Sequence, residues 1–208
     1  MKKYFYCFIF FLFLFTHQSK AQVKFGIQAG AGFSKLTSPY YTLYNSGLCY
    51  SGGLVATLPL KNKLSIVSGL QYESLQSKLT NLVFENNGSI AEGEGTIITP
   101  YSYLKIPVLA RLGIGQEESP KFYVEGGGFV SYLLNAKTSG IDKNTKAAVE
   151  YDADLSIYNK VVVGLSAGLG YQLTTNIDIG GRFNYNLSPV APGGAKFINA
   201  QLLLSYYF

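Results

Sequence analysis

Apolar and polar side chains alternate in this sequence along stretches of about 10 to 13 residues. The clearest is YLKIPVLARL, residues 103–112, an apolar run that contains Lys105, Pro107 and Arg111. Successive side chains of a β-strand point to opposite faces, so these three residues share one face of an extended chain. The opposite face carries only aliphatic residues, namely Leu104, Ile106, Val108, Ala110 and Leu112. This period of two predicts a strand with one apolar and one polar face.

The same alternation recurs along the chain and predicts eight strands. They cover residues 23–35, 48–60, 64–74, 103–112, 122–133, 160–173, 175–187 and 197–208. Strands of this length exceed the usual five or six residues, and a tilted strand of about ten residues can cross a bilayer. Longer and shorter connections alternate between them, which is typical of outer-membrane barrels with short periplasmic turns and long outer loops. We expect 75–99 and 134–159 to be the two long outer loops, and an even strand number places both termini in the periplasm.

The polar face distinguishes a soluble barrel from a membrane-embedded one. A soluble barrel such as a lipocalin also alternates, but its apolar face lies inside and its outer face meets water. Here the polar face holds mostly Gly, Ser, Gln and Asn, while the apolar face is almost free of charge. Unpaired strand edges are costly in hydrocarbon, so the sheet must close. The pattern therefore predicts an all-β fold, an eight-stranded antiparallel transmembrane β-barrel over residues 22–208, with outer-membrane lipid at its outer face.

The N-terminus has the features of a secretory signal peptide. Lys2 and Lys3 precede an unbroken apolar run of twelve residues, 4–15, and small residues stand at Ser19 and Ala21. The run is shorter than the roughly 20 residues of a spanning helix, so a retained anchor is the less favoured alternative. We predict cleavage after Ala21.

Removing residues 1–21 changes the functions that the composition allows. The net charge falls from +5 to +2, and no Lys/Arg cluster remains, so no nucleic-acid partner is expected. The only histidine, His17, is removed as well, which excludes Ser-His-Asp and Cys-His catalysis and histidine-ligated metals. Cys49 is the one cysteine left, so no internal disulfide can form. We expect a non-enzymatic protein without cofactor or metal.

Charges on the polar face are expected to lie inside the barrel. An eight-stranded barrel is only wide enough for packed side chains, and an isolated charge there is costly, so the charges must pair. Arg111 is expected diagonal to Glu125 across the connection between their strands, so that Arg111→Glu impairs folding and Glu125→Lys partly restores it. We predict a luminal charge network that holds the core together, with an ion path as the alternative. Its members are Glu73, Lys105, Arg111, Glu125, Asp178 and Arg182.

Three weaker patterns accompany this network. Pro107 cannot donate to a strand ladder, so it is expected to mark a bulge. Acidic residues Glu150, Asp152 and Asp154 suit either a calcium site or a solvated loop, and the loop is favoured. Tyrosines near the outer strand ends suggest an aromatic girdle; they are Tyr40, Tyr41, Tyr44, Tyr50, Tyr101, Tyr132, Tyr158 and Tyr185.

The chain ends on an aromatic residue, and its strands resemble a known family. Phe208 and Tyr206 continue the apolar face of the last strand and look like the terminal signal by which the barrel-assembly machinery recognises outer-membrane barrels. The segments YLKIPVLARL, FYVEGGGFVSYLL, VVVGLSAGLGYQL and IDIGGRFNYNLSPV, with this terminus, resemble the PorT-like outer-membrane β-barrel family of Bacteroidota. The resemblance implies an eight-stranded, outer-membrane protein A-like barrel. The family includes a subunit of a protein secretion and gliding system.

These observations predict a protein of the cell outer membrane with a structural or interaction role, in a secretion or envelope complex. Its outer loops are expected to contact protein partners. A small porin-like channel is the alternative, which the filled lumen disfavours, and an enzyme acting on lipids is the least favoured possibility.

Overall fold

The computed structural model describes residues 22–38, 44–61, 63–85, 90–115, 121–142 and 147–208. The predicted signal peptide, residues 1–21, lies outside the described residues and stays a prediction. The described residues contain nine strands: β1 (Lys24–Thr37), β2 (Tyr44–Lys61), β3 (Leu64–Phe84), β4 (Ile90–Ile114), β5 (Phe122–Ile141), β6 (Ala148–Asp152), β7 (Val161–Gln172), β8 (Ile177–Asn186) and β9 (Lys196–Tyr207). Two short 3₁₀ helices, η1 (Leu155–Ile157) and η2 (Pro192–Gly194), lie in the connections. No described helix has the length and hydropathy needed to cross a membrane.

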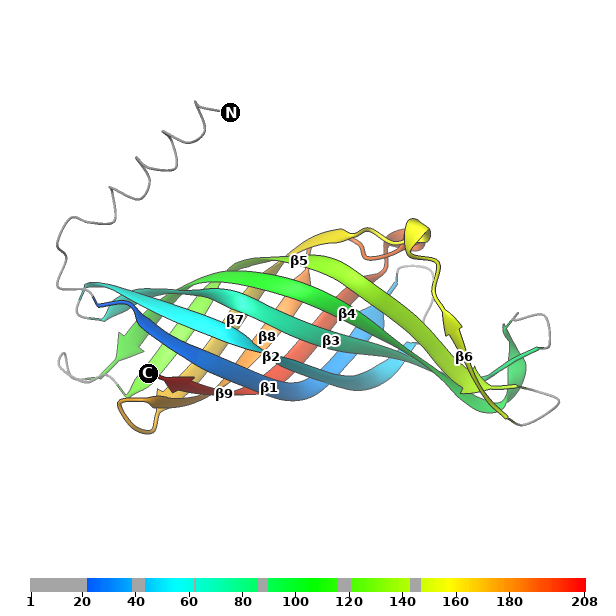
Figure 1. The fold of residues 1–208 in the computed structure, drawn as a ribbon, viewed down its shortest axis with the longest axis horizontal. Coiled ribbons are helices and arrows are strands. Elements are labelled where there is room, and N and C mark those ends of the chain that lie inside the picture. The colour runs from blue at the N-terminus through cyan, green and yellow to red at the C-terminus, as the bar shows by residue number, and fades with distance from the viewer. Residues whose placement is uncertain (1–21, 39–43, 62, 86–89, 116–120, 143–146) are drawn as a thin grey trace, which may run out of the picture.

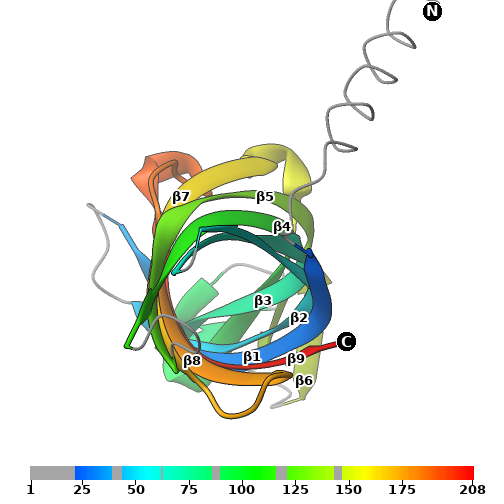
Figure 2. The same cartoon turned by 90° about the vertical axis from the view of Figure 1, so that its left-hand side faces the viewer.

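Eight of the strands close into a barrel. All named strand pairs are antiparallel, in the ring order β1-β2-β3-β4-β5-β7-β8-β9, and β9 pairs with β1 to complete the circle (Figures 1 and 2). The predicted eight-stranded barrel is therefore confirmed. The ninth strand, β6, stands outside the ring and pairs only with the end of β5. The strand pairs β2–β3, β4–β5 and β7–β8 follow one another in the sequence and are joined at the end of the barrel where β1 begins and β9 ends, which we call the turn end; the opposite end is the far end.

The two predicted faces are confirmed along β4. Leu104, Ile106 and Val108 are 37–55% exposed on the outer surface, whereas Lys105 and Arg111 are 1% and 8% exposed inside. Burial also alternates with a period of two in β7 and β9, with the predicted apolar faces on the outer side. The barrel thus turns its aliphatic residues outward, which would be unfavourable in water and is what hydrocarbon requires.

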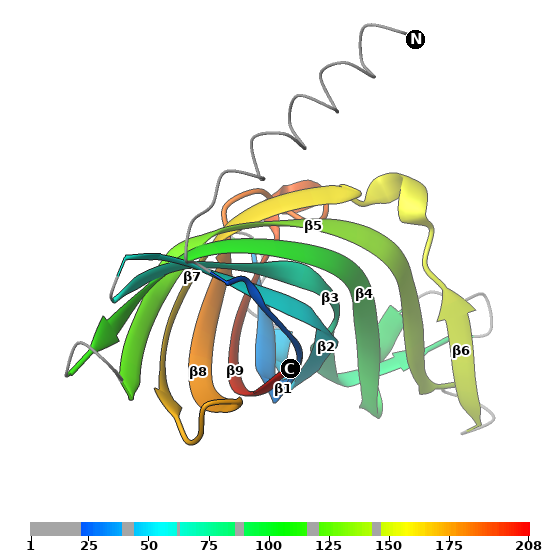
Figure 3. The same cartoon turned by 60° about the vertical axis from the view of Figure 1, so that its left-hand side comes forward.

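The predicted long loops are wrong over most of their length. β3 continues to Phe84 and β4 starts at Ile90, with ladder pairs such as Thr80↔Thr96 in the segment expected to be a loop. β5 likewise runs to Ile141 and pairs with β6. Together, residues 80–84, 90–98, 137–141 and 148–152 form what we call the extension, which projects beyond the barrel at the far end (Figures 1 and 3). The tip between β3 and β4, residues 86–89, lies outside the described residues.

The predicted bulge at Pro107 is also wrong. The register of β4 against β3 is the same before and after the proline, with Gln71↔Lys105 on one side and Ser68↔Val108 on the other. The register shift on the β5 side lies at Ser102/Tyr103 instead. The hydroxyl of Ser68 donates to the Pro107 carbonyl at 2.8 Å, so a side chain supplies a hydrogen bond beside the residue that lacks a donor.

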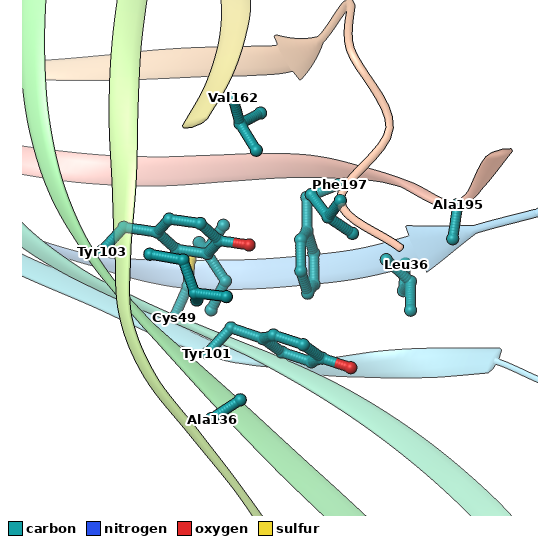
Figure 4. Packing of buried hydrophobic residues seen from close by; sticks show 11 residues of the cluster. Leu36, Cys49, Tyr101, Tyr103, Ala136, Val162, Ala195 and Phe197 are labelled. Atoms are coloured by element: carbon teal, nitrogen blue, oxygen red, sulfur yellow. The ribbon is translucent and has the colours of Figure 1, made fainter. Parts of the chain in front are cut away.

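A buried apolar cluster fills the lumen at the far end. Its buried members are Leu36, Cys49, Leu75, Tyr101, Tyr103, Leu133, Ala136, Val162, Val190, Ala195 and Phe197 (Figure 4). The Tyr101 ring makes edge contacts with Phe197 and Tyr158 at centroid distances of 5.2 and 5.5 Å. Leu155 of η1 packs against the same cluster, so the connection between β6 and β7 covers this end of the lumen.

The predicted aromatic girdle is wrong at two tyrosines, which belong to or pack against the far-end cluster. Tyr101 is 5% exposed and points inward, and Tyr158 packs against it rather than outward. Tyr50 and Tyr132 are 50% and 46% exposed on the outer surface, as expected of girdle residues. Tyr40 and Tyr41 lie outside the described residues.

Candidate functional site in the barrel lumen

The middle of the lumen brings together all six charged residues that the sequence singled out. β3, β4, β5 and β8 supply them, and each is at most 8% exposed. Three are cations and three are anions, so their formal charges cancel. The members are Glu73, Lys105, Arg111, Glu125, Asp178 and Arg182.

Glu125 lies at the centre of the larger group of charges. Its Oε1 accepts from Nε and Nη2 of Arg182 at 2.9 and 2.6 Å, and its Oε2 accepts from Nε and Nη2 of Arg111 at 3.2 and 3.1 Å. Nη1 of Arg111 donates to Asp178 Oδ2 at 2.9 Å. Arg111 and Glu125 face each other directly across β4 and β5 rather than diagonally. Four charges on three strands therefore form one chain, Arg182–Glu125–Arg111–Asp178.

Lys105 and Glu73 form a separate ion pair. Nζ of Lys105 lies 3.2 Å from Glu73 Oε1, and the two side chains are 2% and 3% exposed. The ammonium also lies over the Phe129 ring, 4.2 Å from its centroid. A second ring contact, between the Arg111 guanidinium and Tyr123 at 3.9 Å, supports the larger group. Lys105 and Arg111 thus each meet both a carboxylate and a π-face, which offsets part of their lost hydration.

Buried amides, which were not predicted from the sequence, extend each of the two groups of charges. Gln28 Oε1 accepts from Arg182 Nη1 at 3.3 Å and from Gln71 Nε2 at 2.7 Å, while Gln28 Nε2 donates to the Ser205 hydroxyl. Gln201 Nε2 donates to Glu73 Oε1 at 2.8 Å. Residue parity is the signal that could have found them: in the last strand, the face opposite the predicted apolar face carries Gln201 and Ser205 and lines the lumen.

An open cavity lies below the charges, at the turn end. Its volume is about 490 Å³, and Arg111, Tyr123, Asp178 and Tyr207 line it on the side of the charge network. Along its length the lumen thus contains an apolar cluster, a neutral hydrogen-bonded layer and a cavity.

The described residues offer no metal centre. No group of three or more His, Cys, Asp or Glu side chains in that part of the chain could hold a metal ion. Glu150 and Asp152 lie 3.8 Å from Lys137 on the exposed extension. Asp154 accepts the backbone N–H of Ser156 at 2.9 Å and caps η1, and hydrogen bonding to Ser156 lowers the pKa of its carboxyl. The favoured alternative, a solvated acidic segment, agrees with these positions.

The two C-terminal aromatic residues lie on the outer surface. Tyr206 and Phe208 are 46% and 75% exposed, and their rings meet edge to face at 5.9 Å. The Phe208 N–H donates to the carbonyl of Phe25 at 2.9 Å, which fixes the terminus to β1. The predicted assembly residues are therefore accessible at the turn end of the barrel.

Comparison with known proteins agrees with the fold. A family model described as "Outer membrane protein beta-barrel domain" matches residues 17–191. No curated protein sequence matches significantly. Among solved structures, the chain is similar to Ail, the attachment invasion locus protein of Yersinia pestis, solved in complex with the heparin analogue sucrose octasulfate (14% identity, 90% of this chain and 99% of that chain covered, TM-score 0.49). It is also similar to Neisserial surface protein A (16% identity, 90% of this chain and 99% of that chain covered, TM-score 0.45). A further similar structure is the outer membrane protease OmpT of Escherichia coli (11% identity, 90% of this chain and 96% of that chain covered, TM-score 0.35).

Proposed function

Since the chain belongs to the outer membrane protein beta-barrel domain family, whose fold spans the outer membrane, we propose that it acts there as a non-conducting, non-enzymatic barrel with a structural or interaction role. The occupied lumen is the single observation that carries the proposal. A solute moving along the barrel axis would have to displace the far-end apolar cluster and separate ion pairs whose members are at most 8% exposed. Separating such pairs leaves uncompensated buried charges, which is strongly unfavourable.

The alternative is a small porin-like channel, and electrical recording separates the two. The purified protein is inserted into planar bilayers, and insertion is verified by the shift in gel mobility between folded and heated protein. We expect no discrete conductance steps above those of bilayers that receive detergent alone. Reproducible conductance steps of constant size, whose number rises with the amount of inserted protein, would contradict the proposal and support the channel.

The extension is the surface that we propose for protein partners. It is built of paired strands, and it carries exposed aromatic and charged side chains such as Tyr151, Lys137 and Asp152. Aromatic residues are enriched at protein interfaces, and charged residues lie mainly at the rim. Native mass after extraction from outer membranes in mild detergent tests this. We expect a complex larger than barrel plus micelle, which returns to that mass when residues 137–152, which carry these three side chains, are replaced by a two-residue turn. A native mass of barrel plus micelle for the unmodified chain would contradict the proposal.

The finer parts of the assignment are proposals as well. We infer periplasmic termini because both lie at the end with the short turns, which face the periplasm in such barrels. We propose recognition by the barrel-assembly machinery through Phe208 and Tyr206, supported by their exposure at the end of β9. The resemblance of YLKIPVLARL and its companion segments supports a PorT-like member within a secretion or envelope complex. A non-enzymatic role is supported by the position of the only histidine, His17, within the predicted signal peptide.

A further inference from the structure

The cavity at the turn end has a strongly basic rim. Four lysines line it from separate segments: Lys24 at the start of β1, Lys61 at the end of β2, Lys63 in the following turn and Lys121 just before β5. The one described acid in the lining is Asp178. These lysines come from the start of β1, the connection between β2 and β3 and the segment before β5, and all four line the same cavity.

The charge of this rim is not cancelled from within the barrel. The six luminal charges sum to zero, and Asp178 is already bound by Arg111 at 2.9 Å. None of the four lysines forms an ion pair with a described residue. Glu117 and Glu118 lie outside the described residues, and two acids would not balance four lysines. The opening therefore keeps a positive potential, which a concave low-dielectric surface focuses.

The lining also provides groups that can hold an oxyanion. Lysine ammonium groups are mobile point charges that suit phosphate, and hydroxyl groups of Thr57, Tyr123 and Tyr207 lie in the cavity lining. A volume of about 490 Å³ falls in the range of small-molecule sites, about 300–1,000 Å³. We propose that this cavity binds a small polyanion bearing two or more phosphate groups, either a soluble molecule or the headgroup of an anionic phospholipid.

Calorimetric titration of inorganic tripolyphosphate into the full chain in zwitterionic detergent tests the proposal. We expect saturable binding that weakens with added salt, as binding through ammonium groups requires. In the double variants Lys61→Gln/Lys63→Gln and Lys24→Gln/Lys121→Gln the affinity should fall at least tenfold. The matched control, Lys78→Gln/Lys160→Gln, removes the same charge away from the cavity and should change affinity less than twofold. An unaltered urea unfolding midpoint shows that each variant is folded.

Two results would overturn the proposal: no saturable binding, or an equal loss of affinity in the control and rim variants, which would mean attraction to net charge alone. The source of the phosphate is separated by repeating the titration in nanodiscs. If the site takes lipid headgroups, cardiolipin, whose headgroup bears two phosphates, should weaken tripolyphosphate binding in the nanodisc relative to phosphatidylcholine, in the unmodified protein and not in the rim variants. If the ligand is soluble, the two lipids should give equal affinity. Neither result depends on whether the barrel conducts.

Discussion

Individual charges inside the barrel are stabilised by their partners, because a buried charge without a partner is strongly unfavourable. Lys105 and Glu73 show this most simply, since their ion pair stands apart from the other four charges. Parity in the sequence is enough to place both residues inside. It cannot identify their further contacts, because Gln201 and Phe129 reach them from two other strands, β9 and β5.

Replacing Lys105 with Met should destabilise the protein by about 3–5 kcal/mol, because Glu73 is left buried and charged. The double variant Lys105→Met/Glu73→Gln should recover most of this loss, since the new amide still accepts from Gln201. Urea unfolding of the reconstituted protein measures both changes. The control is Lys137→Met, which removes ion pairs at 3.8 Å whose members are 46–82% exposed, and it should shift stability by less than about 1 kcal/mol. Equal losses at Lys105 and Lys137 would show that the lumen is hydrated.

Charge reversal at Arg111 should not be rescued, in contrast to the expectation from the sequence. Glu125 also binds Arg182, and Arg111 also binds Asp178. In Arg111→Glu/Glu125→Lys the new lysine faces Arg182 and the new glutamate faces Asp178, so each reversal creates a like-charge contact. We expect the double variant to be no more stable than Arg111→Glu in the same urea assay. Recovery of half or more of the lost stability would mean that the pair acts in isolation.

The strands were recognisable from sequence where they meet lipid and not beyond it. Within hydrocarbon every second side chain must be apolar, which gives the period of two in residues 103–112 and 197–208. In the extension both faces leave the hydrocarbon, so the alternation fades although ladder pairs such as Val83↔Ala91 persist. The segment 75–99 was therefore expected to be a loop. In the extension the strands are held by backbone hydrogen bonds, which do not require apolar and polar side chains to alternate.

Close packing between strands accounts for Gly164 on β7. It pairs with Phe129 of β5, and a Cβ at this position would meet the Phe129 ring and the carbonyl of Tyr185. The ring in turn carries the Lys105 ammonium. The glycine thus leaves room for an aromatic side chain that supports a buried cation.

Gly164→Ala should destabilise the barrel by about 1–3 kcal/mol, because the added methyl group overpacks the lumen. The matched control is Gly52→Ala on β2, where a Cβ would meet no atom within 4 Å, and its effect should stay within about 0.5 kcal/mol. Urea unfolding midpoints of both variants decide the question. If Gly52→Ala were as destabilising as Gly164→Ala, the loss would come from the backbone conformation of glycine and not from overpacking of the lumen.

The whole molecule combines an apolar outer surface with a lumen that is filled except at the turn end. The fold class and the two faces could be predicted from residue parity alone, since both are consequences of a two-residue period in a closed sheet. The arrangement of an apolar cluster at one end of the lumen and a cavity at the other could not be predicted in this way. The far-end cluster is completed by residues of the 153–160 connection, and the cavity is completed by residues of three separate turns.

The central claim is that one face of each strand meets lipid while the next residue faces a protected lumen. The chain contains no tryptophan, so a single introduced tryptophan reports its own surroundings. Tyr103 and Leu104 are neighbours on β4, yet they are 2% and 37% exposed. Fluorescence of Leu104→Trp and Tyr103→Trp is compared in bilayers whose phospholipids carry brominated acyl chains. Strong quenching at position 104 with little at position 103 is the expected result. Equal quenching, or stronger quenching at 103, would contradict the account.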